Sequence, residues 1–474
     1  MTEYLEREDK YDVAEDFVLP DLVTAVDGAR RKHVEVRLEN TYFDTADGSL
    51  LARGLLLRRR IGGSDEGWQL KVPEGKARVE LQEPLGDRGQ IPQRLLDVIE
   101  GVRLGKPLDV VAHMVTRRSI DRIVDAEGEA LVEVADDRVE AEDLRADAEP
   151  MQWREVEVEV VAAPPSVLRA ARKQMLAAGA STAASSSKLA RVLGAPARPA
   201  IEGTRATSAV AAYVTEQVEE ILRGDVGLRR GVDPIHATRV AIRRLRSTLR
   251  VFGDFTSAAP EVDEELKWFA GTLGEVRDRQ VQREYFTGAL ATLPPEHVLG
   301  SVAADIEQTL LGEELRARTV VTEVMAGERY RALLALLTEW AARPPVVADA
   351  EDGKLRDAIA AAEHKADKRL KQGIRAREDE PLHRARKAAK RARYAAELGR
   401  PVLGKAKSKR QVKHYKKIQT ELGDHQDAAV AAETLWRLGA RTGTSGSANG
   451  FTYGLLFARE QARGAAAVAA VRGK

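Results

Sequence analysis

Near its N-terminus the chain reads Leu5-Glu6-Arg7-Glu8-Asp9-Lys10, in which charged residues occupy every second position. Alternate side chains of a β-strand project from the same face, so Glu6, Glu8 and Lys10 are expected to point the same way. Far along the chain, residues 154–160 repeat this arrangement, with three glutamates alternating with three valines. The pattern predicts strands that pack one apolar face and present carboxylates and cations on the other.

Other short stretches with period-two alternation fill the rest of the first 195 residues, separated by turn signals such as Ala46-Asp47-Gly48. They add charged residues at alternate positions: Arg58, Arg60, Lys71, Arg78 and Glu80. One interpretation is an antiparallel sheet with a solvated ionic face. The other is a barrel whose polar face lines a channel, where carboxylates hold Mg²⁺ or Mn²⁺ and cations neutralise phosphate oxygens. The repetition across several strands favours the barrel.

The composition excludes several classes of site and of protein. The 474 residues include no cysteine, which excludes disulfides, thiolate zinc sites and cysteine nucleophiles. The sequence has no apolar run of transmembrane length and no signal-peptide pattern, so we expect a cytoplasmic protein. Residues 1–200 hold 29 Lys and Arg against 37 Asp and Glu, a balance of −8, and the remainder holds 46 against 37, a balance of +9. Two units of opposite charge are implied.

The second half predicts an internal duplication. Residues 194–205 combine two prolines and two glycines without periodicity, which is typical of a linker, and we place that linker at 196–204. Beyond it, residues 236–246 match residues 383–393 at an offset of 147, and Leu-Gly-x-x-x-Asp at 273–278 recurs at 422–427. We therefore expect domains at 1–195 and 205–474, the second all-helical with copies at about 205–340 and 350–474.

Each copy carries a basic stripe, because cations spaced three and four residues apart share one helix face. The stripe comprises His236, Arg239, Arg243, Arg246 and Arg250 in the first copy and His383, Arg386, Lys390 and Arg393 in the second, where Glu397 takes the place of the last arginine; Lys413, Lys416 and Lys417 form a further cluster. A solvated helix face is the plain alternative for either copy alone. Two related cationic helices across a groove would suit a long, regular polyanion.

Nucleic acid and metal are the competing ligands for this stripe. Few aromatic residues lie near it and the sequence has no RNP-like or zinc-finger motif, which argues against nucleic acid. The predicted helices have no His-x-x-x-His pair, which argues against metal. Leu273-Gly274 and Leu422-Gly423 are interpreted as packing and turn elements. A polyanion that is bound through its backbone alone therefore fits the stripe better, and we expect no membrane partner.

The first 195 residues resemble CYTH domains, the triphosphate tunnel metalloenzymes. The resemblance rests on motifs in a fixed order: Glu6-x-Glu8-x-Lys10, Tyr42-Phe43-Asp44-Thr45, Leu57-Arg58-x-Arg60, Trp68-Gln69-Leu70-Lys71, Arg78-x-Glu80, Thr116-x-Arg118, Glu155-x-Glu157-x-Glu159 and Ser187-Lys188. It implies an antiparallel eight-stranded β tunnel with helices, which hydrolyses triphosphates with Mg²⁺ or Mn²⁺.

The same resemblance implies roles for individual residues. Metal would be bound by Glu6, Glu8, Glu157 and Glu159. The triphosphate would be bound by Lys10, Arg58, Arg60, Lys71, Arg78, Arg118 and Lys188. Glu80 and Asp137 would be further acidic groups lining the tunnel, as catalytic residues that help to hold a second metal or orient water. Asp136 competes with Asp137, and Arg117 with Arg118, for the inward-facing position.

Residues 205–474 resemble the CHAD domain, an all-α unit of two pseudo-symmetric four-helix bundles whose basic central surface binds inorganic polyphosphate. Together the resemblances imply an α+β multidomain protein, an inorganic triphosphatase with a polyphosphate-binding helical domain. The open alternatives are a tunnel acting on nucleoside or thiamine triphosphate, an adenylate cyclase, a binding-only protein, and a helical half that docks nucleic acid or protein. Association with polyphosphate granules in the cytoplasm is one option for its location.

Overall fold

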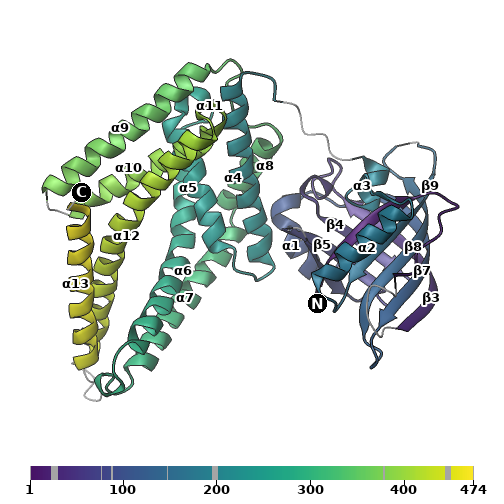
Figure 1. Ribbon diagram of the computed structural model, residues 1–474, viewed down its shortest axis with the longest axis horizontal. Helices are drawn as coiled ribbons and strands as arrows, with labels where there is room; N and C mark the ends of the chain where they lie inside the picture. The colour runs from purple at the N-terminus through teal and green to yellow at the C-terminus, as the bar shows by residue number, and fades with distance from the viewer. Residues whose placement is uncertain are drawn as a thin grey trace. The chain divides into compact units, whose positions relative to one another are not determined.

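The computed structural model describes residues 2–22, 30–75, 77–86, 89–146, 148–194, 201–376, 379–442 and 450–472. The chain separates into two compact units, Met1–Arg198 and Pro199–Lys474. The N-terminal unit, purple to blue in Figure 1, carries a sheet, and the teal-to-yellow unit is built from helices. Most of the expected linker at 196–204 lies outside the described residues.

One antiparallel sheet dominates the N-terminal unit, with ten strands in the order β1-β6-β5-β4-β3-β7-β8-β9-β2-β10. Its strands are β1 (Thr2–Glu6), β2 (Glu8–Val13), β3 (Arg30–Asp44), β4 (Leu56–Ile61), β5 (Gly67–Glu74), β6 (Ala77–Glu83), β7 (Asp109–Val124), β8 (Ala130–Asp143), β9 (Met151–Val160) and β10 (Ser181–Thr182). The stretches with alternating apolar and charged residues all form strands, as their period predicts.

The N-terminal stretch expected as one strand is divided at Arg7. β1 pairs with β6, placing Glu6 opposite Arg78, whereas β2 pairs with β9, placing Glu8 opposite Glu159. Consecutive residues of the chain therefore pair with strands near opposite ends of the sheet. The expectation of an eight-stranded tunnel is therefore wrong in two respects: among the described residues the sheet has ten strands, and its hydrogen-bonded order ends at β1 and β10 without closing.

The outer face of the sheet is covered by α2 (Pro165–Ala177). Its Ala171 and Met175 pack in a buried cluster with Tyr11, Val156 and Val158. Because side chains alternate along β9, burial of these valines outside directs the glutamates between them to the inner face.

One end of the inner face is filled by α3 (Lys188–Leu193). Leu189 and Ala190 pack there with Tyr42, Met114 and Val139, whose side chains come from β3, β7 and β8. The hydroxyl of Ser187 caps α3 by accepting a hydrogen bond from the Ala190 amide. A further helix, α1 (Gln93–Arg103), lies between β6 and β7 in the chain. The apolar end leaves the charged residues to the remainder of the inner face.

The C-terminal unit contains two matching successions of helices. The first is α4 (Arg205–Arg229), α5 (Ile235–Val251), α6 (Glu261–Ala291), α7 (Val302–Ala326) and α8 (Glu328–Ala342), and the second is α9 (Asp352–Ala376), α10 (Asp379–Leu398), α11 (Arg400–Leu403), α12 (Lys405–Thr442) and α13 (Phe451–Arg472). α8, which packs against α4 and α7, is a fifth long helix that the four-helix expectation did not include.

The two successions share part of their core. Phe286 of α6 and Leu310 of α7 belong to the same buried cluster as Leu435 of α12 and Tyr453 of α13. α5 also packs against α10, which brings the two basic stripes together. In the part of the chain that the structure describes, every helix is too short or too polar to cross a bilayer.

Candidate functional site

The inner face of the sheet surrounds a pocket of about 490 Å³. Side chains from β1 to β9, together with Lys188 at the start of α3, line this pocket. Eleven of the residues predicted for the tunnel are among them: Glu6, Lys10, Arg58, Arg60, Lys71, Arg78, Glu80, Arg118, Glu157, Glu159 and Lys188. The fold therefore brings together residues that are up to 182 positions apart in the sequence.

A row of glutamates crosses three neighbouring strands of the sheet, and two of its members line the pocket. Glu159 of β9 lies directly opposite Glu8 of β2 on one side and Glu133 of β8 on the other. Burial, Glu6 and Glu8 raise the pKa of Glu159 to about 7. Like charges directly opposite each other destabilise a sheet, so this row is poised to accept a cation.

Two oxygens of this region could serve as ligands for such a cation. Glu6 Oε2 and Glu159 Oε1 are buried and have no hydrogen-bond partner among the described residues. Carboxylate oxygens are the ligands that Mg²⁺ and Mn²⁺ prefer. These donors fit a hard divalent cation.

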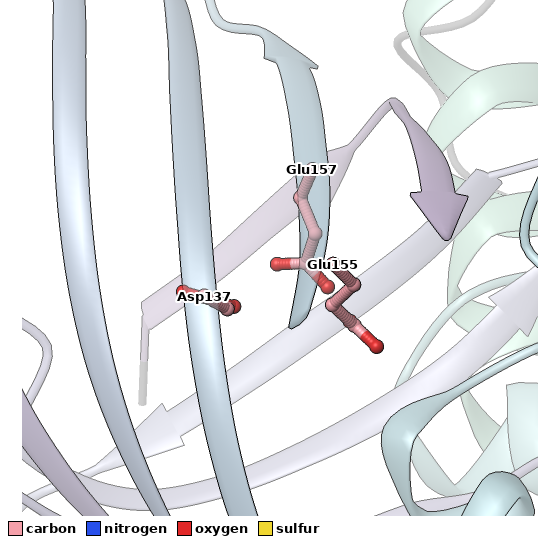
Figure 2. A group of neighbouring side chains, drawn as sticks. All are labelled: Asp137, Glu155 and Glu157. Atoms are coloured by element: carbon pink, nitrogen blue, oxygen red, sulfur yellow. The ribbon is translucent and has the colours of Figure 1, made fainter. Parts of the chain in front are cut away.

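A second acidic group lies deeper and is already neutralised. Carboxylate oxygens of Asp137, Glu155 and Glu157 all lie within 4.8 Å of one another, and Figure 2 shows the three side chains on β8 and β9. Lys188 Nζ lies 2.5 Å from Glu155 Oε1, 2.7 Å from Glu157 Oε1 and 2.9 Å from Asp137 Oδ2. A metal that took these three carboxylates would have to displace this lysine.

Glu157 has two further cationic partners. Lys10 Nζ lies 2.5 Å from its Oε1, and the Arg118 Nη2 donates a hydrogen bond of 2.7 Å to its Oε2. Burial opposes ionisation of Glu157, but Lys10, Lys188 and Arg118 outweigh it and hold its pKa well below the usual range. The carboxylate is therefore charged at neutral pH.

The opposite wall concentrates arginines. Arg58 Nε donates to Gln69 Oε1 at 2.6 Å, and Arg60 Nε donates to Asn40 Oδ1 at 2.9 Å. Burial and the neighbouring Arg58 lower the pKa of Arg60 to about 10, with Asp65 opposing them. This crowding of cations is relieved when an anion binds between them.

Lys71 connects the two walls. Its Nζ lies 2.5 Å from Glu6 Oε1 and 3.2 Å from Glu80 Oε2. Burial raises the pKa of Glu80, but Lys71 and Arg58 outweigh it and lower the pKa overall. Glu80 is thus an ionised group at the border between the acidic and the basic wall.

The structure resolves both positional ambiguities of the sequence. Arg118 points inward and bonds to Asp137, whereas Arg117 is largely exposed and pairs with Glu140. Asp136 instead pairs with Arg154.

Two predicted residues, Glu8 and Asp137, are not among those that line the pocket. Asp137 is fully buried behind Arg118 and Lys188, and Glu8 pairs with Lys10 at 2.8 Å. In this ion-paired state, Arg118 and Lys188 neutralise the Asp137 carboxylate. Arg78, by contrast, is at the pocket border, where it donates to the Ser186 carbonyl at 2.9 Å.

The prediction also missed a charged pair of the pocket wall, Arg122 and Glu133. Arg122 Nε lies 2.5 Å from Glu133 Oε1. Arg122 follows Arg118 by four residues and Glu133 precedes Asp137 by four, so strand parity places both on the inner face once Arg118 and Asp137 are known to face inward. The same parity identifies Glu155, whose place in the acidic cluster the predicted metal set did not include.

In the helical unit, the two copies hold one arginine in the same way. Arg239 Nη1 donates to the Gly274 carbonyl and lies 3.1 Å from Asp278 Oδ1. In the second copy Arg386 Nη1 lies 3.7 Å from Asp427 Oδ1.

The repeated glycine makes room for this arginine. A Cβ added at Gly274 would lie 3.2 Å from Arg239 Nη2, and one at Gly423 would lie 3.1 Å from Arg386 Nη2. The Leu-Gly pairs lie inside α6 and α12, so the expectation of turn elements is wrong; the buried leucines confirm the packing role.

Where α5 meets α10, cations of both copies approach each other. Burial, Arg386 and Arg243 lower the pKa of Lys390 to about 8, although Asp427 opposes them. Burial also lowers the pKa of Arg243, with Arg239 and Arg393 contributing. The centre of this surface therefore carries positive charge that the protein compensates only in part.

The remaining stripe residues vary in their surroundings. Arg246 and Arg250 both pair with Asp263 of α6. His383 Nδ1 lies 2.6 Å from Gln426 Oε1. Partial desolvation of the His236 ring, together with the nearby Arg277, lowers the pKa of His236. Lys413, Lys416 and Lys417 are exposed on α12.

Comparison with known proteins matches both units. The CYTH domain model matches residues 5–192 and the CHAD domain model matches residues 212–436. Two uncharacterized proteins of Mycobacterium tuberculosis are each 36% identical over 502 residues, which cover 96% of this chain and 93% of theirs. The chain belongs to the CYTH–CHAD proteins. The sequence resemblance is thereby confirmed for both units.

Solved structures similar to this CYTH–CHAD protein each correspond to one part of it. PptA from Streptomyces chartreusis has a TM-score of 0.47 and 23% identity and covers 56% of this chain and 98% of its own. The CHAD domain of the plant Ricinus communis has a TM-score of 0.46 and 25% identity, covering 59% and 96%. A putative adenylyl cyclase from Hippeastrum, described as having dominant triphosphatase activity, has a TM-score of 0.27 and 18% identity, covering 41% and 98%.

Proposed function

We propose that the N-terminal unit hydrolyses inorganic triphosphate with Mg²⁺ or Mn²⁺, and that the C-terminal unit binds inorganic polyphosphate. The observation that supports this most is the pocket itself, which has a volume of about 490 Å³. Glutamates of β8 and β9 and buried arginines both line it. CYTH domains generally act on triphosphates, and the membership of this chain in that family supports the assignment.

Each wall of the pocket has its own task. Arg58, Arg60 and Arg118 would hold phosphate oxygens, since guanidinium groups donate to them in a planar fork. Lys188 and Lys10 would turn from their carboxylate partners to the phosphate chain when a cation replaces them. The cations would thereby neutralise the departing phosphate in place, which is the main requirement of phosphoryl transfer.

The acidic wall would hold the divalent cation through Glu6, Glu8, Glu157 and Glu159. The cation would supply a polarised water molecule and charge neutralisation at the phosphate oxygens. Glu80 and Asp137 would serve as supporting carboxylates, Glu80 at the pocket surface and Asp137 by orienting Arg118 and Lys188.

Phosphate release from tripolyphosphate, ATP and long-chain polyphosphate tests the first half of the proposal. Wild-type protein is expected to release phosphate from tripolyphosphate only with Mg²⁺ or Mn²⁺, and Glu6→Gln/Glu8→Gln is expected to lose that release. Faster release from ATP would favour the nucleoside triphosphate alternative. Release from none of the three substrates would leave a binding-only protein.

Competition binding tests the second half. The full-length protein in EDTA is titrated with long-chain polyphosphate and with RNA of equal phosphate content. We expect polyphosphate to bind more tightly, because the basic surface offers phosphate contacts while few aromatic side chains are available for base stacking. Equal affinity for the two polymers would contradict this assignment.

A further inference from the structure

The two halves of the basic surface have different charges. The repeat relates Arg244 of α5 to Arg391 of α10, and Arg250 to Glu397. In one half, Glu397 Oε2 lies 3.2 Å from Arg244 Nη2, and its Oε1 lies 3.2 Å from Arg393 Nε. Tyr213 donates a further hydrogen bond of 3.2 Å to Glu397. A carboxylate between the two arginines of this half therefore offsets part of their charge.

In the other half, that carboxylate is replaced by Arg250. The charges of Arg250, of Arg369 on α9 and of Arg246 all repel the charge of Arg391. The nearby carboxylate is Asp263 of α6, whose oxygens already accept hydrogen bonds from Arg246 and Arg250. Arg391 and Arg369 make no ion pair and no side-chain hydrogen bond with the rest of the described chain.

The charges of the two halves can be compared directly. Arg391 and the charged groups that act most strongly on it, three arginines and Asp263, sum to +3, whereas Arg244 and the charged groups that act most strongly on it, Glu397 and Glu216, sum to −1. Burial, Arg250 and Arg369 lower the pKa of Arg391, with Asp263 opposing them. Arginine remains protonated in proteins at neutral pH, so the crowding is relieved by a bound anion and not by proton loss.

The end of a polyphosphate chain is the anion that matches this excess. A terminal phosphate has two ionisable oxygens with a second pKa of about 6, and it carries about −1.5 to −2 at pH 7. Each internal phosphate has a single ionisable oxygen. We propose that Arg391, Arg369 and Arg250 form a subsite for the terminal phosphate of polyphosphate, which gives the basic surface a direction along the bound chain. This inference rests on the polyphosphate binding proposed above.

The experiment compares chains that differ only at their ends. Short-chain polyphosphate of one defined length is used with free ends, or with both terminal phosphates converted to ethanolamine phosphoramidates, which removes one ionisable oxygen from each end. Binding to the full-length protein is measured by calorimetry in EDTA. Wild-type protein is expected to bind the free-ended chain several-fold more tightly than the capped chain.

Two variants locate the effect. Arg391→Gln/Arg369→Gln is expected to bind free and capped chains with equal affinity, and because it removes like charges it should melt no lower than the wild type. Arg244→Gln removes the symmetry-related arginine and is expected to keep the preference for free ends. Arg369→Gln alone, which leaves α10 unchanged, is expected to reduce the preference in part.

The outcomes separate this inference from the proposal beneath it. If the wild type binds neither chain, polyphosphate binding itself is wrong. If the wild type binds both chains equally, or if the double variant keeps the preference for free ends, the terminal subsite is wrong while polyphosphate binding stands. Stronger competition by a 5′-phosphorylated RNA than by free-ended polyphosphate would reassign the arginines to a nucleic-acid end.

Discussion

Replacement of Lys188 by methionine is the most informative perturbation of the pocket. In the structure its ammonium group contacts Asp137, Glu155 and Glu157, and its side chain is only 9% exposed. Without it, three carboxylates keep Lys10 and Arg118 as their cations, so one buried negative charge is left uncompensated. Removal of one partner from a buried ion pair costs about 3–5 kcal/mol.

The assay is thermal unfolding of the metal-free protein. For a unit of this size each kcal/mol corresponds to about 2–4 °C, so the N-terminal transition of Lys188→Met is expected about 6–20 °C below that of the wild type. Mg²⁺ should restore more stability in the variant than in the wild type, because the vacated position is lined by carboxylates. A Mg²⁺ concentration of about 100 times its Kd would raise the free energy of unfolding by about 2.7 kcal/mol.

The matched control is Lys106→Met. Lys106 pairs with Asp47 at 2.6 Å, but both side chains are about half exposed. Such a pair is worth about 0–1 kcal/mol, so little change is expected. An unchanged melting temperature for Lys188→Met, or a Mg²⁺ response equal to that of the wild type, would refute the reasoning.

Three further predictions concern other parts of the molecule. Glu159→Gln removes like-charge contacts with Glu8 and Glu133. It should therefore stabilise the metal-free protein by about 0.2–1 kcal/mol in thermal melts and weaken Mg²⁺ binding. Lower stability of the metal-free variant would contradict the repulsion between these glutamates. Because a polyanion favours the protonated form of Lys390, whose pKa is about 8, polyphosphate affinity should be constant below that pH and fall by up to about tenfold per unit above it. Lys390→Arg should flatten this profile in binding titrations at several pH values, and an unchanged profile would exclude Lys390 as its source. Gly274→Ala should lower polyphosphate affinity by moving Arg239. The control Gly288→Ala lies on the same helix, and its added Cβ meets nothing within 4 Å, so it should leave affinity unchanged and raise stability by about 1 kcal/mol. Equal affinities of the two variants would show that Gly274 does not contribute to the binding site.

Strand parity accounts for what could be predicted of the pocket. In Glu155-x-Glu157-x-Glu159 the intervening valines pack outside, so the direction of each glutamate follows from the sequence alone. Two adjacent residues of the same type, as in Asp136-Asp137 and Arg117-Arg118, defeat parity because either member satisfies the pattern. Register with the neighbouring strand decides between them, and register depends on contacts that are distant in the sequence.

Which carboxylate pairs with which cation could not be predicted from the sequence, for a different reason. A list of carboxylates and a list of cations does not reveal that Lys188 sits among Asp137, Glu155 and Glu157, since that depends on where α3 packs against the inner face. The division at Arg7 was equally hidden, because residues on both sides of it keep the same alternation. In the helical unit, the offset of 147 located both stripes, but the role of Gly274 required the position of the Arg239 guanidinium.

The buried cluster shared by α6, α7, α12 and α13 has a consequence for the duplicated helical unit. Phe286 and Leu310 belong to one copy, whereas Leu435 and Tyr453 belong to the other, so either copy made alone would expose a large apolar surface to water. Although the sequence repeats one helical pattern twice, the two copies have to fold as a single cooperative unit. A chain cut between α8 and α9 is accordingly expected to yield two insoluble fragments that regain structure only when they are refolded together.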